Sequence, residues 1–283
     1  MGNIYDALRR AELEEPGTDP FTAHTWVSDA SPQPLAMGVL TLEQVPPLQP
    51  TGAMDARLVA ITDGGGPAAE QFRVLSIRLR DLQTQSSLKK ILVTSSISGE
   101  GKSLVAANLA ASLARGAQQK VLLLGGDLRC FALNRYFGCN SLVGLSEYLL
   151  GDSPYTNFLY QIGSLPLWFM PGGTSPCQVL QLLESDRLQG LLETLANTFD
   201  WVIIDSSPLL PLADANVWAR MVDGTLLVVR EGTTPKKLLQ KAIDVLGKVP
   251  VVGVVVNDSK RGYDNVAAYG KEERPIDGDG KPA

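Results

Sequence analysis

The sequence predicts an α/β fold with three layers, in which a mostly parallel central sheet is flanked by helices. Two observations lead to this fold class. Short, nearly all-apolar runs alternate with longer amphipathic segments between about Ala68 and Asn257, and such runs are typical of parallel strands buried on both faces. In addition, 45% of the 283 residues are hydrophobic, which is enough for a substantial core. The expected strands are Lys90 to Thr94, Val121 to Leu124, Pro166 to Met170, Trp201 to Asp205, Thr225 to Val229 and Val251 to Val256.

Two of the connecting helices carry recognisable end signals. Gly116 is expected to end the helix after the first strand, because glycine commonly takes the left-handed position beyond a helix C-terminus. Thr234 and Pro235 are expected to cap and start the helix before the last strand. Right-handed crossovers between parallel strands would place a ligand at the carboxyl ends of those strands.

Composition divides the chain into three segments. The first opens with a short helical pattern and continues, from Glu15 to Pro50, as a proline-rich stretch that predicts an extended tether rather than a packed unit. The last combines glycine, proline and mixed charge with almost no apolar period, which predicts disorder. The segments are 1–65 (helix and proline-rich linker), 66–257 (the α/β domain) and 258–283 (a tail that contains tyrosines).

Charge and cysteine content exclude several classes of protein. The formal net charge of -5 argues against a nucleic-acid partner, because a surface that follows phosphates normally shows as a basic excess. The three cysteines lack the paired spacing of a metal site, and with no signal peptide they indicate reduced thiols. No apolar run approaches the ~20 residues that cross a bilayer. We therefore expect a cytoplasmic protein.

A phosphate-binding loop is predicted between the first strand and the helix after it. The loop Ser98-Gly99-Glu100-Gly101-Lys102-Ser103 follows an apolar strand and opens an amphipathic helix that continues with Leu104. Backbone N–H groups of such a loop and the positive helix end bind phosphate, Lys102 adds a charge near the β and γ phosphates, and Ser103 is placed to bind Mg²⁺. The pattern GxxxxGK[ST] is imperfect, because Ser96 stands at its first glycine. An ordinary strand-to-helix turn is the alternative, and the strand and helix on either side disfavour it.

Two further predicted strands end in acidic residues. Asp205 closes an apolar run in the manner of a Walker B strand, and Asp127 follows the strand that ends near Leu124. A carboxylate beside a phosphate loop orients a Mg²⁺ water, and the metal neutralises charge on the transferring phosphoryl group. Alone, each aspartate would more often be a turn or helix cap. Together with the loop, we assign Asp127 and Asp205 to Mg²⁺ binding and catalysis, alongside Lys102.

The order of these motifs resembles that of the bacterial tyrosine kinases of capsule and exopolysaccharide synthesis, a branch of the MinD/ParA-like deviant P-loop ATPases. The resemblance covers most of the chain and implies a P-loop NTPase fold. It rests on the stretches Ile4–Glu12, Ser98–Ser103, Asp127–Arg129, Gly144–Leu149, Phe199–Ala215 and Asp223–Arg230.

The resemblance implies an activity, cofactors and partners. The implied reaction is phosphorylation of tyrosine by ATP and Mg²⁺, with acceptors in the kinase's own tail, which here contains Tyr263 and Tyr269. Asn257 matches the position at which relatives read the adenine base. The implied partner is a membrane chain-length or co-polymerase protein, made as a separate chain, that recruits the kinase to the inner face of the cell membrane. A neighbouring subunit's site is within reach of Tyr269, because twelve extended residues span about 40 Å.

One departure from the family concerns catalysis. The family's second strand motif carries two aspartates, and the first of them is Gly125 here. In relatives that aspartate is assigned to metal organisation or to activating the tyrosine hydroxyl. Loss of a positioned base typically costs ~10²–10⁴-fold, so the substitution predicts slow transfer or none, with ATP binding intact. Glu100 and Asp214 are candidate substitutes for the missing carboxylate, and a helix-capping role for Asp214 is equally open.

A second departure concerns assembly. The stretch from Glu70 to Ser76 resembles the Glu-x-x-Arg-x-x-Arg helix that links subunits into rings in this family, with Ser76 in place of the second arginine. The alternative interpretation of its charged residues is a solvated helix face. Self-association into a homo-oligomer is therefore expected to be weakened.

Three functions remain open at this point. The first is an autophosphorylating tyrosine kinase that regulates exopolysaccharide or capsule biosynthesis and export. The second is a catalytically weakened ATP-binding regulatory or scaffold protein of the same system, which Gly125 favours. The third, a MinD/ParA-type positioning ATPase, usually has a terminal amphipathic membrane helix or a basic surface, and the sequence shows neither.

Overall fold

The computed structural model describes residues 41–62, 66–174, 178–210 and 212–259. The predicted N-terminal helical pattern, most of the proline-rich stretch, and the tail with Tyr263 and Tyr269 lie outside the described residues. In the described part, no helix is long and apolar enough to cross a membrane.

A seven-stranded sheet forms the centre of the protein, with the strand order β3-β4-β2-β5-β1-β6-β7. Neighbouring strands are parallel except for β3 and β4. Because β2, β5 and β1 are adjacent, the loops that leave their carboxyl ends meet at one edge of the sheet. The strands are β1 (Lys90–Ser95), β2 (Val121–Gly125), β3 (Tyr160–Gln161), β4 (Leu167–Met170), β5 (Trp201–Asp205), β6 (Gly224–Arg230) and β7 (Val251–Asn257).

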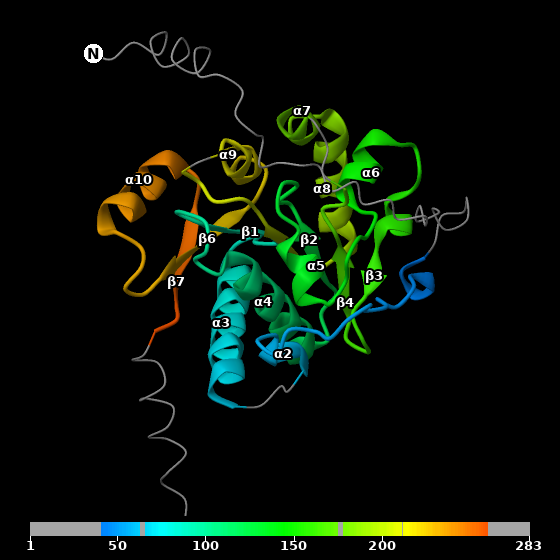
Figure 1. The fold of residues 1–283 in the computed structure, drawn as a ribbon, viewed down its shortest axis with the longest axis horizontal. Helices are drawn as coiled ribbons and strands as arrows, with labels where there is room; N and C mark the ends of the chain where they lie inside the picture. The colour runs from blue at the N-terminus through cyan, green and yellow to red at the C-terminus, as the bar shows by residue number, and fades with distance from the viewer. Residues whose placement is uncertain (1–40, 63–65, 175–177, 211, 260–283) are drawn as a thin grey trace, which may run out of the picture. The chain divides into compact units, whose positions relative to one another are not determined.

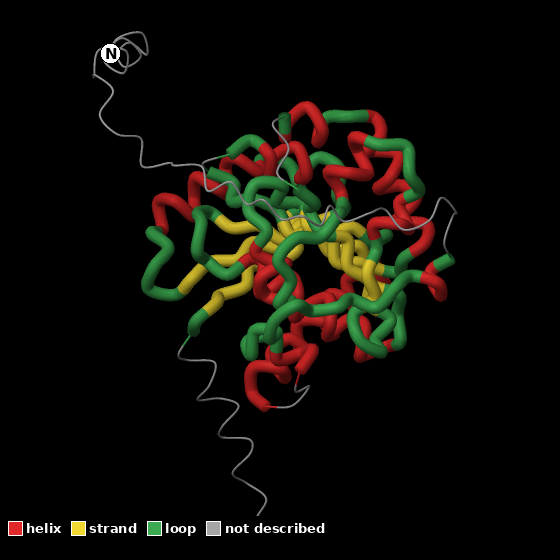
Figure 2. The backbone as a smooth tube through the Cα atoms, turned by 45° about the vertical axis from the view of Figure 1, so that its right-hand side comes forward, coloured by secondary structure: helices red, strands yellow, loops and turns green. Residues whose placement is uncertain are grey.

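Helices cover both faces of the sheet and complete the three predicted layers (Figure 1). One face packs against α2 to α5 and the other against α6 to α10. Figure 2 shows the strands as a yellow layer between the two helical layers. The helices are α2 (Val59–Thr62), α3 (Gly66–Gln85), α4 (Lys102–Ala117), α5 (Ala132–Tyr136), α6 (Leu145–Leu150), α7 (Val179–Leu183), α8 (Asp186–Thr198), α9 (Asp214–Ala219) and α10 (Lys236–Leu246), with 3-10 turns η1 (Leu42–Gln44) and η2 (Tyr155–Phe158).

The predicted strands are all present, with ends shifted by at most one residue. The expectation that each is buried on both faces is wrong for β7. Val251, Val254 and Val256 are 40%, 49% and 52% exposed, because β7 is the last strand of the sheet. The short antiparallel strand β3 was not predicted, since two residues carry no period that could be read from the sequence.

Both predicted helix-end signals are displaced. Helix α4 continues past Gly116 to Ala117, and Gln118 takes the left-handed conformation with φ of 52°. Pro235 occupies the N-cap position of α10, whereas Thr234 makes no cap. The Thr234 hydroxyl instead bonds the carboxylate of Glu100, which places it in the phosphate-loop network described below.

The end of the expected tether packs onto the domain, contrary to the prediction of an extended unpacked linker. Val45 and Leu48 are buried in the core, and the Leu48 N–H donates to the Gln161 carbonyl at 2.8 Å. Leu58, just before α2, is also fully buried. Val45 and Leu48 come from the proline-rich stretch, where the spacing of apolar residues did not predict burial because it follows neither the helical nor the strand period.

Candidate nucleotide-binding site

The predicted phosphate loop connects β1 to α4 at the carboxyl edge of the sheet. Gly99 and Gly101 have φ of 87° and 93°, a conformation that suits glycine. The loop turns the chain directly into the N-terminus of α4, a 16-residue helix whose buried face is rich in alanine. Backbone N–H groups and the helix dipole therefore converge on one point, as anion binding requires.

Asn257 lies against the loop from the end of β7. Its side-chain amide donates to the Glu100 carbonyl at 2.9 Å. A side chain at Gly101 would put its Cβ 2.1 Å from the amide nitrogen, so glycine at this position is required by the contact as well as by φ. The loop and the end of β7 are thus coupled by direct contact, although 156 residues separate Gly101 from Asn257 in the sequence.

Lys102 lies close to both predicted carboxylates. Its ammonium group is 3.4 Å from the Asp127 carboxylate, and both side chains are largely buried. Burial alone would lower the pKa of Lys102, but the charges of Asp205 and Asp127 together outweigh burial and raise the pKa. The lysine is therefore held as a cation inside the site. Asp127 is fixed in turn by the N–H groups of Arg129 and Cys130, at 3.2 and 3.1 Å.

Asp205 is suited to a divalent cation. The side chain is 1% exposed, and its Oδ1 has no hydrogen-bond partner within the described residues. A buried carboxylate oxygen without a donor is costly unless something positive binds it. Ser103 bonds the same carboxylate. Mg²⁺ in nucleotide sites takes one or two carboxylates plus phosphates and waters, so Ser103 and Asp205 fit such an ion.

The burial of Asp205 predicts a pH-dependent stability. Burial raises its pKa to about 6, although the charge of Lys102 and the Ser103 bond oppose the shift. The folded chain binds this proton more tightly than the unfolded chain, in which the pKa of Asp is about 3.9. The free energy of unfolding without metal should therefore fall as the pH rises from about 4 through 6. Asp205→Asn should remove this component. The check is urea unfolding of both proteins across this pH range with EDTA present; parallel curves would contradict the assignment.

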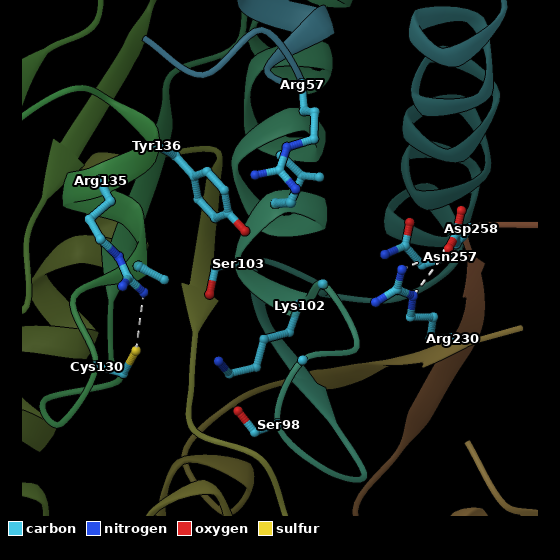
Figure 3. A pocket seen from close by; sticks show the side chains of 14 residues that line it. Arg57, Ser98, Lys102, Ser103, Cys130, Arg135, Tyr136, Arg230, Asn257 and Asp258 are labelled. Carbon is cyan, nitrogen blue, oxygen red and sulfur yellow. Dashed lines mark hydrogen bonds and ion pairs between the residues drawn. The ribbon is translucent and has the colours of Figure 1, made fainter. Parts of the chain in front are cut away.

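The phosphate loop borders a cavity of about 350 Å³, within the range of pockets that hold small-molecule ligands. Figure 3 shows Lys102 and Ser103 at its centre, with Asn257 on one side and Arg135 and Tyr136 on the other. Most of the predicted nucleotide contacts line this cavity, namely Ser98, Gly99, Gly101, Lys102, Ser103, Leu104 and Asn257. The structure therefore brings together residues from the two ends of the domain.

Glu100 is the predicted contact that does not line the cavity. It is 1% exposed, and its carboxylate accepts from the Ile97 N–H at 2.8 Å and from the Thr234 hydroxyl. Both oxygens are thus used to brace the loop. Asp214, the other candidate substitute for the missing aspartate, is 2% exposed and forms a bidentate pair with Arg129 at 2.6 and 3.2 Å. Neither carboxylate is available as a base in this structure.

The position of Gly125 has no room for a side chain. A Cβ there would lie 2.7 Å from the backbone nitrogen of Gly172 and 3.2 Å from the carbonyl carbon of Pro171. The loop after β4 therefore fills the space that a side chain at position 125 would need. Gly126 is equally enclosed, since a Cβ there would lie 2.9 Å from both Ile204 and Trp218.

Glu147 in α6 holds the loop that covers Gly125. Its carboxylate accepts from the backbone N–H groups of Gly144 and Thr174 at 2.7 and 2.9 Å and from the Ser146 hydroxyl at 3.0 Å. The N–H groups of Leu145 and Ser146 donate to the carbonyls of Pro171 and Gly172. This network was not predicted, although Glu147 lies in a stretch that matches the family.

Removing the Glu147 carboxylate should destabilise the fold. Glu147→Ala leaves several donors without their charged acceptor, and hydrogen bonds to charged groups contribute about 1.5–3 kcal/mol each. Since water can replace part of this loss, we expect unfolding to become easier by about 2 kcal/mol. Chemical denaturation measures the change, with the exposed Glu193→Ala on α8 as control. Equal stability of the two variants would show that the network contributes little.

The stretch from Glu70 to Ser76, which resembles the family's assembly motif, has a buried serine where the second arginine would be. Ser76 is fully buried and bonds the Arg73 carbonyl at 2.8 Å, with the Ser112 hydroxyl of α4 at 3.3 Å. It therefore packs inside the domain instead of offering a charged contact on the surface. Glu70 and Arg73 form an ion pair on the same helix.

Three arginines that sequence reasoning missed line the cavity, and one of them, Arg230, is paired with Asp258. Arg57 and Arg135 both line the cavity, Arg57 from the segment before α2 and Arg135 from α5. No motif marks Arg57, because it lies in a segment predicted to be linker. Arg135 stands near the acidic strand end in sequence, but a single arginine in a short helix is most often a solvated side chain.

Comparisons with known proteins agree with this architecture. No family model matches the sequence. The chain is 31% identical over 209 residues to the tyrosine-protein kinase YwqD of Bacillus subtilis, covering 73% of this chain and 88% of YwqD. It is 32% identical over 197 residues to the succinoglycan biosynthesis transport protein ExoP of Rhizobium meliloti, covering 67% of this chain but 25% of ExoP. The relatives therefore include much longer proteins.

Solved structures give the same result. The kinase domain of the Escherichia coli tyrosine kinase Etk superposes with a TM-score of 0.67 and 28% identity, covering 77% of this chain and 88% of the domain. The septum site-determining protein MinD of Pyrococcus horikoshii, at 22% identity and a TM-score of 0.52, shares the fold. The fold, the motifs and the identity to YwqD lead to one conclusion. The chain belongs to the family of bacterial tyrosine-protein kinases.

Proposed function

We propose that this chain binds Mg-ATP in the cavity beside the phosphate loop and transfers the γ-phosphoryl group to tyrosine, as part of a polysaccharide biosynthesis and export system. The observation that carries the proposal is the proximity of Lys102 to Asp127 and Asp205 at the N-terminus of α4. These groups lie where the loop N–H groups and the helix dipole favour phosphate.

Each residue has a defined part in this proposal. The loop N–H groups from Ser98 to Ser103 bind the phosphates, and Lys102 neutralises charge on the β and γ phosphates. Ser103 and Asp205 would hold Mg²⁺, which when bound neutralises charge on the phosphoryl group that moves. Asn257, whose side-chain amide donates to the Glu100 carbonyl, would contact the adenine base.

The reaction transfers one phosphoryl group. A bond forms between the phenolic oxygen and the γ-phosphorus, the bond from that phosphorus to the β,γ-bridging oxygen breaks, and ADP and a proton are released. Tyr263 and Tyr269 are the proposed acceptors. They follow the end of β7 by six and twelve residues, and its last residue, Asn257, lines the cavity.

A second function, ATP-dependent binding without transfer, is favoured by the environment of Gly125. Backbone atoms of Pro171 and Gly172 occupy the space in which relatives carry a carboxylate. Within the described residues, Asp258 is the acidic residue that lines the cavity, and it is paired with Arg230 at 2.9 Å. A chain of this kind would hold Mg-ATP and present the nucleotide-bound state to a partner.

The two functions are separated by mapping phosphotyrosine. The purified chain is incubated with Mg-ATP and digested for mass spectrometry, beside a Tyr263→Phe/Tyr269→Phe double variant. A kinase accumulates phosphate on the two tail tyrosines and the double variant accumulates none. A chain that binds Mg-ATP tightly but stays unmodified under prolonged incubation is the binding module.

The partner we infer is a membrane chain-length or co-polymerase protein. The relative ExoP is named a transport protein of succinoglycan biosynthesis, and because transport of a polysaccharide takes place at a membrane, a kinase of such a system would act beside a membrane protein. Cell fractionation tests this. The chain should move to the membrane fraction when the co-polymerase of the same locus is expressed, and an unchanged distribution would refute the inference.

A further inference from the structure

An N-terminal strap, defined as residues 51–62, crosses the domain beside the phosphate loop. The N–H groups of Thr51 and Gly52 each donate to the Gly138 carbonyl at 2.9 Å, and the Asp55 N–H donates to the Tyr136 carbonyl at the same distance. The strap is therefore bound to α5 and to the turn that follows it. Its second half forms α2, which packs against α4.

Two side chains of α4 fix the second half of the strap. Asn108, which is fully buried, accepts from the Ala60 N–H at 2.9 Å and donates to the Arg57 carbonyl at 3.0 Å. Arg115 donates to the carbonyls of Ala60 and Ile61 at 2.7 and 2.8 Å. Buried polar side chains that bond the backbone on both sides hold a segment in one position. The strap is thus attached to the same helix that begins at Lys102.

This attachment places Arg57 at the cavity. Figure 3 shows its side chain descending from the strap between Tyr136 and the Asn257 side of the site. The guanidinium bonds Asp55 through two nitrogens, at 2.9 and 2.7 Å, and lies 5.5 Å from the centre of the Tyr136 ring. The arginine is oriented from two sides, and part of its donor set still faces the cavity.

Arg135 enters the same cavity from α5. Its guanidinium makes a weak hydrogen bond, 3.7 Å to the Cys130 sulfur, and it has no ion-pair partner within the described residues. An arginine that is left without a carboxylate beside a phosphate loop is suited to an anionic ligand, because its planar fork matches phosphate oxygens.

Resting on the proposed function, we propose that Arg57 and Arg135 bind the phosphate chain of the nucleotide from the side of the cavity opposite the phosphate loop. The strap is then a part of the nucleotide site rather than a linker. The site would close around the triphosphate with cations on both sides, Lys102 from the loop and the two arginines from the strap and α5.

The test is nucleotide affinity at two ionic strengths, measured by calorimetry on the full chain. Arg57→Ala and Arg135→Ala should each weaken ATP binding about tenfold, equal to about 1.4 kcal/mol, and should weaken AMP binding less. Loss of a phosphate contact should also reduce the salt dependence of binding. Arg57→Lys and Arg135→Lys should retain part of the ATP affinity and part of its salt dependence. Arg78→Ala, an exposed arginine of α3, serves as control.

A structural role for Arg57 gives a different result. If the side chain only holds the strap through Asp55 and Tyr136, Arg57→Ala lowers the thermal unfolding temperature while the ATP affinity and its salt dependence stay unchanged, and the proposal is wrong. Equal losses for ATP and AMP would also overturn the assignment to the phosphate chain. Absence of ATP binding in the unaltered chain would instead reject the proposed function itself.

Discussion

Lys102→Ala should bind ATP with about 30- to 100-fold lower affinity than the unaltered chain. This corresponds to about 2–3 kcal/mol of binding free energy, the magnitude of a hydrogen bond to a charged group. The reason is electrostatic. In the structure Lys102 lies close to Asp127 and Asp205, and without it the triphosphate would face these two carboxylates with no protein cation on the loop side of the cavity. Any phosphotyrosine that the unaltered chain forms should disappear as well. Displacement of a fluorescent ATP analogue measures the affinity.

The control for this substitution is Lys248→Ala, an exposed lysine beyond α10 and away from the cavity. Its ATP affinity should equal that of the unaltered chain. Thermal unfolding of both variants shows whether the fold is kept. If Lys102→Ala binds ATP as tightly as Lys248→Ala does, the loop is not the phosphate site.

Gly125→Asp should destabilise the protein and should fail to restore a catalytic base. The new Cβ would lie 2.7 Å from the Gly172 nitrogen, a backbone atom held by the α6 contacts and by Glu147. Forcing extra atoms into a packed site typically costs 1–3 kcal/mol, or about 2–4 °C per kcal/mol in unfolding temperature for a domain of this size. The added carboxylate would also be buried near Asp127 and Asp205. Differential scanning calorimetry gives the shift.

The chain offers a matched glycine for comparison. Gly190 lies inside α8 with no atom within 4 Å of a Cβ placed on it, so Gly190→Ala should be neutral or stabilising by about 0.5–1 kcal/mol through helix propensity. Two results together would contradict this expectation: an unchanged unfolding temperature in Gly125→Asp, and more phosphotyrosine than the unaltered chain forms. They would show that the 171–173 loop moves readily and that the site lacks only the carboxylate at position 125.

Much of the fold could be read from the sequence, because buried parallel strands produce apolar runs that need no tertiary knowledge to recognise. The phosphate loop was equally visible, since its glycines, lysine and serine are contiguous. Asp127, Asp205 and Asn257 could be assigned as well, because each lies at or shortly after the end of a predicted strand and strand ends share one edge of the sheet. The roles of these residues in binding and transfer stay predictions.

The features of the fold and the site that could not be predicted depend on contacts between residues distant in sequence. Nothing near Gly125 indicates that the Gly172 backbone fills its side-chain space, and no pattern around Arg57 indicates that Asn108 fixes its carbonyl. The exposure of β7 follows from its place at the sheet edge, which an apolar run does not reveal. Glu100 was predicted as a nucleotide contact from its position in the loop, and the sequence did not indicate that its carboxylate also braces the loop through Ile97 and Thr234.

A crystal structure with Mg²⁺ and a non-hydrolysable ATP analogue would test the central claim most directly. The account predicts the triphosphate on the backbone of Ser98 to Ser103, the metal against Ser103 and Asp205, and the guanidinium groups of Arg57 and Arg135 on the opposite side of the phosphates. A nucleotide bound elsewhere, or an empty loop at saturating analogue, would contradict it.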